Sequence, residues 1–330
     1  MKKNILLFLM VAMAGNVILS GCSKSKKTAA SPESNAGSST AAATPDGPVE
    51  LKIKWAAGKK YSMRLEFNQG TEMNAPGQPE PVKQEVKMAQ DFTFTAVNQL
   101  DNGGWQLELE FEQESMDVLQ GGRSVLNFDT TQSPDMDTNN PVAPIMRAMV
   151  GARIQYFIDA SGKVEKLGGV AELLNHIVAT TKPRQQAMFK QMFSEDTLKQ
   201  YGSFSETLPN RLVNIGESWS VKRDIGSAIG TLTVDMNYTF KNWELHGDRQ
   251  CAHIVDTGNI YSKSVSAAMT GAAVEVESGK TSGDVWFDPE LGMIVDVNTD
   301  QDMTMKITTR TATFRQQLNQ KIRMKLVDVE

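Results

Sequence analysis

The feature of this chain that most constrains its fold is a repeated alternation of apolar and polar residues. In the clearest run, apolar side chains fill every second position: Tyr61, Met63, Leu65 and Phe67. Residues 92–97 and 105–111 repeat the alternation. Because successive side chains of a strand point to opposite faces, a period of two predicts half-buried antiparallel strands. The pair Asn102-Gly103 between the last two runs predicts a hairpin turn.

The same pattern starts again in the second half of the chain. Residues 216–219 correspond in type to residues 58–61. Residues 285–295 repeat the order found in 156–164, which is an aromatic strand, an aspartate, a turn with glycine and an apolar strand. We interpret this as an internal duplication. The alternative is that all antiparallel sheets look alike, since their turns favour glycine and aspartate.

The sequence therefore predicts a mainly β fold with a large antiparallel sheet or sheets. Its two related halves, half-barrel or sandwich-like, would cover about 49–168 and 208–330, with a short helical segment at about 169–203 inserted between them. Apolar residues of this segment have helical spacing: Leu173, Leu174, Ile177 and Val178. The less regular stretch 113–145 is interpreted as a long loop, followed by a short helix at 144–150.

The N-terminal residues have the pattern of an export signal. Two lysines precede an apolar run, residues 5–19, and small residues lead into Cys22. The alternative is an uncleaved membrane helix, but Gly15 and Asn16 interrupt the run, which is shorter than the roughly 20 residues that cross a bilayer. Leu19-Ser20-Gly21-Cys22 resembles the lipobox of bacterial lipoproteins. This resemblance implies that the Cys22 thiol carries lipid, with acyl chains such as palmitate, and becomes the mature N-terminus.

The predicted organisation is a signal peptide at 1–21, a lipidated cysteine and disordered tether at 22–48, and a β-rich domain at 49–330. Between Ser23 and Pro48 the chain has no aromatic or branched apolar residue, so it cannot bury enough surface to order itself. Ser23, in place of an aspartate retention signal, favours the outer membrane of the bacterial cell envelope. Two acyl chains would hold the protein on a membrane stably.

Charge argues against a nucleic-acid partner. The formal net charge is −5, and removing the two lysines of residues 1–21 makes it −7. No block of basic residues is present, as nucleic-acid binding would require.

A search for catalytic residues gives no candidate. Three histidines are present, and the separation of seven between His246 and His253 would place them on opposite faces of one strand, with His176 isolated on a helix. Zinc needs three or four converging ligands, which this spacing does not supply. We therefore expect no metal site, no cofactor and no enzymatic activity.

Two further motifs favour structural roles. Residues 135–139 copy the opening of a calcium loop, but Asn140 takes the place of its glycine and Met146 that of its bidentate glutamate, so we expect a solvated acidic loop. Cys251 is the one free thiol left after lipidation and lies in a strand-like run, which favours burial.

A family resemblance rests on the Gly-x-x-aromatic turns, the Asn-Gly hairpin, the segment from Leu208-Pro209 to Trp219, and the hairpin from Phe287 to Gly292. These features resemble a family of uncharacterised bacterial lipoproteins that carry a domain of unknown function, over roughly residues 50–328. More distantly, many strands with one helical insertion are similar to the curved half-barrels of envelope lipid and lipoprotein carriers.

We therefore expect a lipid-anchored, non-catalytic binding or scaffolding module of the cell envelope, whose partner is an unknown envelope protein or an apolar ligand. The alternative is a carrier that holds an apolar ligand, a lipid or a lipoprotein, between the curved sheet and the helices. The residues expected to line that ligand are Leu173, Ile177, Phe189 and Met192.

Overall fold

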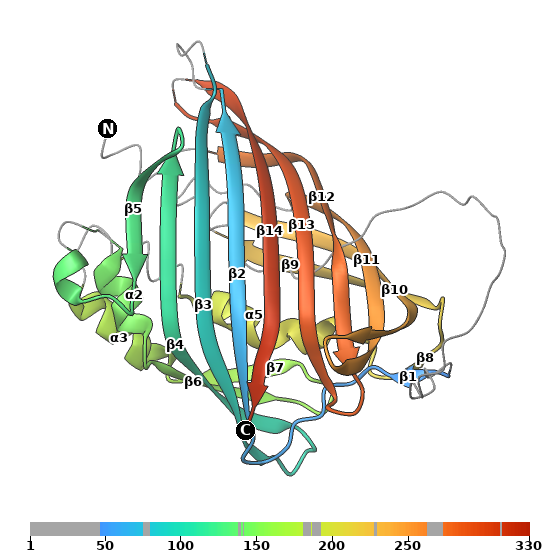
Figure 1. Ribbon diagram of the computed structural model, residues 1–330. Coiled ribbons are helices and arrows are strands. Elements are labelled where there is room, and N and C mark those ends of the chain that lie inside the picture. The colour runs from blue at the N-terminus through green and yellow to red at the C-terminus, as the bar shows by residue number, and fades with distance from the viewer. Residues whose placement is uncertain are drawn as a thin grey trace, which may run out of the picture.

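The computed structural model describes residues 47–74, 80–137, 140, 142–180, 186, 193–227, 230–262, 273–310 and 312–330. Twelve of its strands form one antiparallel sheet, which is curved but not closed into a barrel (Figure 1). The predicted mainly β fold with a large antiparallel sheet is confirmed. No helix in the described part of the chain is long and apolar enough to span a membrane.

The first half of the chain supplies one side of the sheet and the second half supplies the other. The strands of the first half are β2 (Lys60–Met73), β3 (Val82–Gln99), β4 (Trp105–Gln120), β5 (Arg123–Asp129), β6 (Arg153–Ile158) and β7 (Val164–Gly168). Those of the second half are β9 (Ser218–Ser227), β10 (Gly230–His246), β11 (Arg249–Ser262), β12 (Ala273–Asp288), β13 (Met293–Thr308) and β14 (Thr313–Val329).

Each half is an up-and-down meander, and the two halves join where β2 pairs with β14. The repeated motifs occupy matching positions, because residues 58–61 and 216–219 lead into the first strand of each meander. Residues 156–164 and 285–295 likewise form the hairpin between its fourth and fifth main strands, β6–β7 and β12–β13. This order agrees with the interpretation of two related halves.

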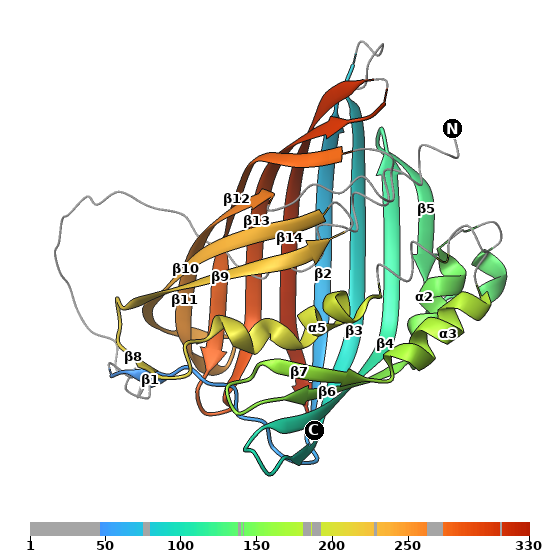
Figure 2. The same ribbon diagram turned by 180° about the vertical axis from the view of Figure 1, so that it is seen from behind.

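The helical insert lies between the two meanders. It contains α3 (Val170–Thr180), α5 (Glu195–Gly202) and the 3₁₀ turn η2 (Ser203–Thr207), and it leads to the two-residue strand β8 (Leu212–Val213), which pairs with β1 (Val49–Glu50). Before β6, the short helix α2 (Ala143–Met149) confirms the predicted helix and packs against α3. Figure 2 shows α5, β6 and β7 crossing the lower part of one side of the sheet, which we call the inner face.

The prediction of a loop over 113–145 was wrong for its first half. β4 continues to Gln120, a Gly121-Gly122 turn follows, and β5 returns beside it as far as Asp129. The register shows the reason, because Asp91 of β3 pairs with Gln113 while Phe92 pairs with Phe111. Glu112 is thus a bulge residue, and it shifts the alternation of apolar and polar positions by one residue in mid-strand.

The outer face of the sheet is charged. Cross-strand ion pairs include Arg64–Asp91 at 3.0 Å and Lys321–Asp300 at 3.2 Å, and they join neighbouring strands through half-exposed side chains. Exposed pairs of this kind are worth at most about 1 kcal/mol each. The outer face is therefore a solvated surface, and the apolar side chains of the strands gather on the inner face.

Candidate binding face on the inner side of the sheet

The lower part of the inner face is filled by aromatic side chains. Trp55 meets Tyr61 edge to face with ring centroids 5.0 Å apart, and Phe94 meets Tyr156 in the same way at 5.6 Å. The Tyr156 hydroxyl donates a 2.6 Å hydrogen bond to the carbonyl of Leu198 in α5. This part of the inner face is a packed core held beneath α5.

Higher on the inner face, polar side chains replace the apolar ones. They stand opposite one another on four adjacent strands, β2, β14, β13 and β12, and we call them the polar belt: Gln69, Gln320, Gln301 and Thr281. At about 4.8 Å per strand the belt is roughly 14 Å long. All four side chains are buried, with at most 3% of their surface exposed.

Apolar residues border the polar belt on both sides. In the next inner-face row towards the open end of the sheet lie Leu318 and Met303, and in the next row towards the aromatic core lie Phe67 and Ile322. Thr299, opposite Ile322, adds a polar group to the lower row, and Thr71, opposite Leu318, adds one to the upper row. The inner face therefore carries a stripe of amide and hydroxyl groups flanked by large apolar side chains.

Two acceptors of this stripe are unpaired within the described structure. Gln69 Nε2 donates to the Thr71 hydroxyl at 3.2 Å, but Gln69 Oε1 accepts no hydrogen bond. The hydroxyl oxygen of Thr299 also has no partner, and both side chains are at most 3% exposed. Leaving a buried polar atom without a hydrogen bond costs about 1–3 kcal/mol of folding free energy, and such atoms are rare in native proteins. Two of them in neighbouring rows of one face therefore call for an explanation.

Glu114 is a buried carboxyl group on the same inner face. It follows the β4 bulge, and Gln90 Nε2 on β3 donates a hydrogen bond to its Oε1 atom. Burial raises the pKa of Glu114 from 4.5 to about 8, so the group is mostly protonated at neutral pH. Tyr201 of α5 lies between Phe92 and Phe111, and its pKa is also raised, first by burial and then by the charge of Glu114.

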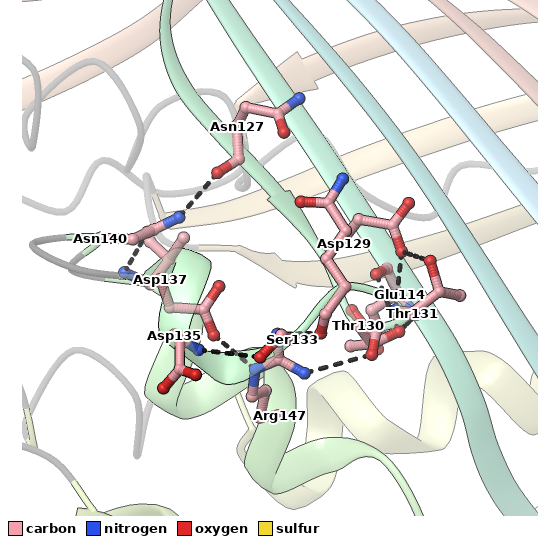
Figure 3. Close-up of polar contacts among 12 residues, drawn as sticks. Glu114, Asn127, Asp129, Thr130, Thr131, Ser133, Asp135, Asp137, Asn140 and Arg147 are labelled. Carbon is pink, nitrogen blue, oxygen red and sulfur yellow. Dashed lines mark hydrogen bonds and ion pairs between the residues drawn. The ribbon is translucent and has the colours of Figure 1, made fainter.

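The corner between β5 and α2 is organised by Arg147 (Figure 3). Its guanidinium donates to Asp137 at 2.5 Å, to the carbonyl of Thr130 at 3.1 Å and to that of Gln132 at 2.8 Å. Thr130 is in turn joined to the backbone of Glu114, whose amide donates to the Thr130 hydroxyl at 2.9 Å. Asp137 of the calcium-like motif thus forms an ion pair with Arg147.

His176 lies on α3, as predicted, whereas His246 and His253 lie on the outer face of the sheet, and the predicted arrangement of these two was wrong. A Gly247-Asp248 turn separates them, so His246 ends β10 and His253 lies in β11 on the neighbouring strand. Both imidazoles stack on Trp286 of β12, with ring centroids 4.2 Å and 5.1 Å from it. The expectation of opposite faces failed because it treated the two residues as part of one strand.

Carboxylates flank this stack. His246 Nε2 lies 3.1 Å from Asp296, and His253 Nε2 lies 2.6 Å from Asp284. The nearby thiol of Cys251 is fully buried, as predicted, and burial raises its pKa to about 12. The thiol is therefore protonated and inert at neutral pH. Within the described residues, no cluster of three or more histidine, cysteine, aspartate and glutamate side chains could hold a metal ion.

The residues predicted to line an apolar ligand are placed only in part. Leu173 and Ile177 of α3 are buried among the core side chains. Phe189, Met192 and the lipid-attachment residue Cys22 lie outside the described residues. Ligand lining by these side chains stays a prediction.

The polar belt was missed in the sequence, although a signal was present. In β2 and β14 the residues Gln69 and Gln320 stand in the phase of the apolar residues, where the alternation calls for an apolar side chain. A glutamine in that phase is buried, and this could have been read from the pattern alone.

A family model and several solved structures are similar to this chain. The model of a family of unknown function, DUF6263, matches residues 102–313. No curated protein matches the chain. Among solved structures, a lipovitellin structure on lipid–protein interactions aligns with a TM-score of 0.45 and 7% identity, over 84% of this chain and 26% of that chain. The chain thus spans about a quarter of the lipovitellin chain.

Two other solved structures are similar at a lower level. A putative exported protein with a YmcC-like fold from Bacteroides fragilis aligns with a TM-score of 0.27 and 10% identity, over 85% of this chain and 99% of that chain. DynF from the dynemicin biosynthesis pathway of Micromonospora chersina aligns with a TM-score of 0.19 and 5% identity, over 89% and 92%.

Proposed function

Since the chain belongs to a family of unknown function, DUF6263, we propose a role from its own structure: it is a lipid-anchored, non-catalytic binding module of the cell envelope whose ligand lies against the inner face of the sheet. The observation that carries this proposal is the polar belt together with two unpaired, buried acceptors, one on Gln69 of the belt and one on Thr299 in the neighbouring row. A core that served only stability would gain from apolar side chains at these positions.

The chemistry of the belt indicates an amphipathic ligand. The unpaired atoms are the amide oxygen of Gln69 and the hydroxyl oxygen of Thr299, both of which can accept a hydrogen bond. A hydroxyl or amide group of a ligand would donate to them. Met303 and Leu318 lie on one side of the belt and Phe67 on the other. These apolar side chains would contact the apolar part of the ligand.

Anchoring by lipid at Cys22 is the second part of the proposal. It rests on the lipobox-like sequence Leu19-Ser20-Gly21-Cys22 and on the low-complexity segment between Cys22 and the first described residue, Gly47. The Ser23 position favours the outer membrane. The absence of catalysis is likewise proposed, and the protonated Cys251 thiol beside the histidine stack supports it.

The alternative role is that of a carrier, which releases its ligand to another site. It would use the same inner face, and the apolar rows on both sides of the belt favour a lipid as its ligand. A carrier would exchange its bound ligand with a membrane or another protein, whereas a static binding module would keep it.

The binding proposal is tested with the full chain purified from membranes in mild detergent. Bound small molecules are extracted and identified by mass spectrometry, first from wild type and then from Gln69→Leu. We expect an amphipathic molecule near one copy per chain in wild type and its loss in Gln69→Leu, because the variant removes the amide at the belt. Exchange with added vesicles of labelled lipid distinguishes a carrier from a static module.

A matched control is Gln317→Leu, which makes the same change at an exposed position on β14, on the outer face. It should retain the ligand. A wild-type protein that carries no molecule, or a folded Gln69→Leu that retains it, contradicts the proposal. Thermal unfolding confirms that each variant is folded.

A further inference from the structure

Three large apolar side chains are exposed close to the point where the chain enters the fold. Leu212 is 61% exposed, Ile215 45% and Leu245 69%. Single exposed leucines are ordinary on a protein surface, so their grouping and position need to be established from the contacts around them.

Backbone contacts bring the segment that carries Leu212 and Ile215 to β10, the strand that carries Leu245. The amide of Gly216 donates to the carbonyl of Phe240 at 2.7 Å, and the amide of Phe240 donates to Glu217 at 3.1 Å. The segment before β9 therefore runs along β10 towards its C-terminal end. Leu212 and Ile215 belong to this segment.

The first described residues lie at the same place. Trp243 Nε1 donates to the carbonyl of Gly47 at 3.1 Å, and Val49 pairs with Val213 in the β1–β8 ribbon. Leu245 is two residues beyond Trp243, on the same side of β10. Figure 1 shows β1 and β8 together at the lower right end of the molecule. The exposed residues thus flank the start of the folded domain.

We propose that this surface, formed by Leu212, Ile215 and Leu245, rests on the lipid bilayer and orients the domain on the membrane. The proposal rests on the proposed lipid anchor at Cys22. The 26 residues from Cys22 to Gly47 would have a typical end-to-end distance of about 28 Å if flexible. The tether therefore holds the surface within reach of the bilayer whenever the anchor is inserted.

With the chain anchored, even a weak apolar contact is enough to keep this surface on the bilayer. The three side chains are only partly exposed and offer a small apolar area, so by themselves they would bind a free protein to membranes weakly. An anchored chain would keep this surface near the bilayer at an effective concentration in the millimolar range, which turns such contact into a populated state.

The test uses the full lipidated chain reconstituted into phosphatidylcholine vesicles that contain nitroxide-labelled lipid. An environment-sensitive fluorophore is attached at Leu212→Cys or Leu245→Cys, and at Met136→Cys as the matched control. Met136 is 73% exposed and lies in the 3₁₀ turn η1 (Pro134–Asp137), shortly before α2, and Figure 1 shows α2 on the opposite side of the molecule from β1. Cys251 is fully buried and does not compete for the label.

We expect the nitroxide lipid to quench the fluorophores at positions 212 and 245 several-fold more strongly than the one at position 136. Equal or no quenching at the three positions in protein that floats with the vesicles overturns the bilayer contact and leaves the anchor intact. Protein that does not float with the vesicles overturns the anchor, and with it this proposal.

Discussion

The sharpest prediction concerns Glu114, the buried carboxyl group that links β3, β4 and α5. We consider the substitution Glu114→Gln. A glutamine has nearly the same shape, its amide oxygen can still accept the hydrogen bond from Gln90, and it cannot ionise. The variant therefore isolates the effect of the negative charge.

The magnitude follows from the pKa of Glu114, which folding raises from 4.5 to about 8. Between these values the unfolded chain has lost a proton that the folded protein keeps. Stability is therefore unaffected below about pH 4.5, falls as pH rises and levels off above about pH 8. Each pH unit costs about 1.4 kcal/mol, so the wild type loses about 3 kcal/mol by pH 7 and about 4 kcal/mol by pH 8, where the folded carboxyl is half ionised.

The assay is urea unfolding of wild type and Glu114→Gln at pH 5, 6, 7 and 8, followed by tryptophan fluorescence. We expect similar free energies of unfolding at pH 5 and an advantage for the variant that grows to about 3 kcal/mol at pH 7, equivalent to about 6 °C in Tm. Other ionisable groups cancel in the difference between the two proteins.

The matched control is Glu112→Gln, two residues away at the bulge, where the side chain is exposed and accepts a hydrogen bond from Thr93. Because this carboxyl is exposed and not buried, its replacement should not give the gain of about 3 kcal/mol at pH 7 that is expected for Glu114→Gln. A Glu114→Gln variant that is less stable than wild type at pH 7, or whose difference is independent of pH, would refute a buried neutral carboxyl at this position.

Three other predictions can be checked directly. Cys22→Ser should move the protein from the membrane to the soluble fraction, and unchanged fractionation would exclude lipidation at this residue. Cys251 should react with thiol reagents at pH 8 only after unfolding, because its thiol is buried with a pKa of about 12; rapid labelling of native protein would contradict this. Arg147→Lys should cost about 1–3 kcal/mol in urea unfolding, because lysine cannot reach Asp137 and two carbonyls at once, while Arg123→Lys on the exposed part of β5 should be neutral.

Local patterns predicted the strands well where the alternation is unbroken. Tyr61 to Phe67 and Ile322 to Leu326 lie in β2 and β14, as expected, since each residue of a regular strand alternates between the two faces. The same rule failed at β4. The extra residue Glu112 breaks the period of two. The sequence pattern therefore predicted a loop for the second half of β4 and for β5.

Contacts between residues on different strands could not be predicted from the sequence. His246 and His253 were expected on opposite faces of one strand. In the structure both stack on Trp286, because a turn between them places them on neighbouring strands. Gln69 and Gln320 are far apart in the chain, and only the pairing of β2 with β14 places them side by side.

What the sequence by itself determined is therefore the secondary structure and the sorting of side chains between two faces, because both depend on the period of residues within one strand. Which glutamines share a row, which rings stack and which residues flank the start of the domain were decided by the tertiary structure. These relations depend on register between strands, and register is set by the packing of the whole curved sheet.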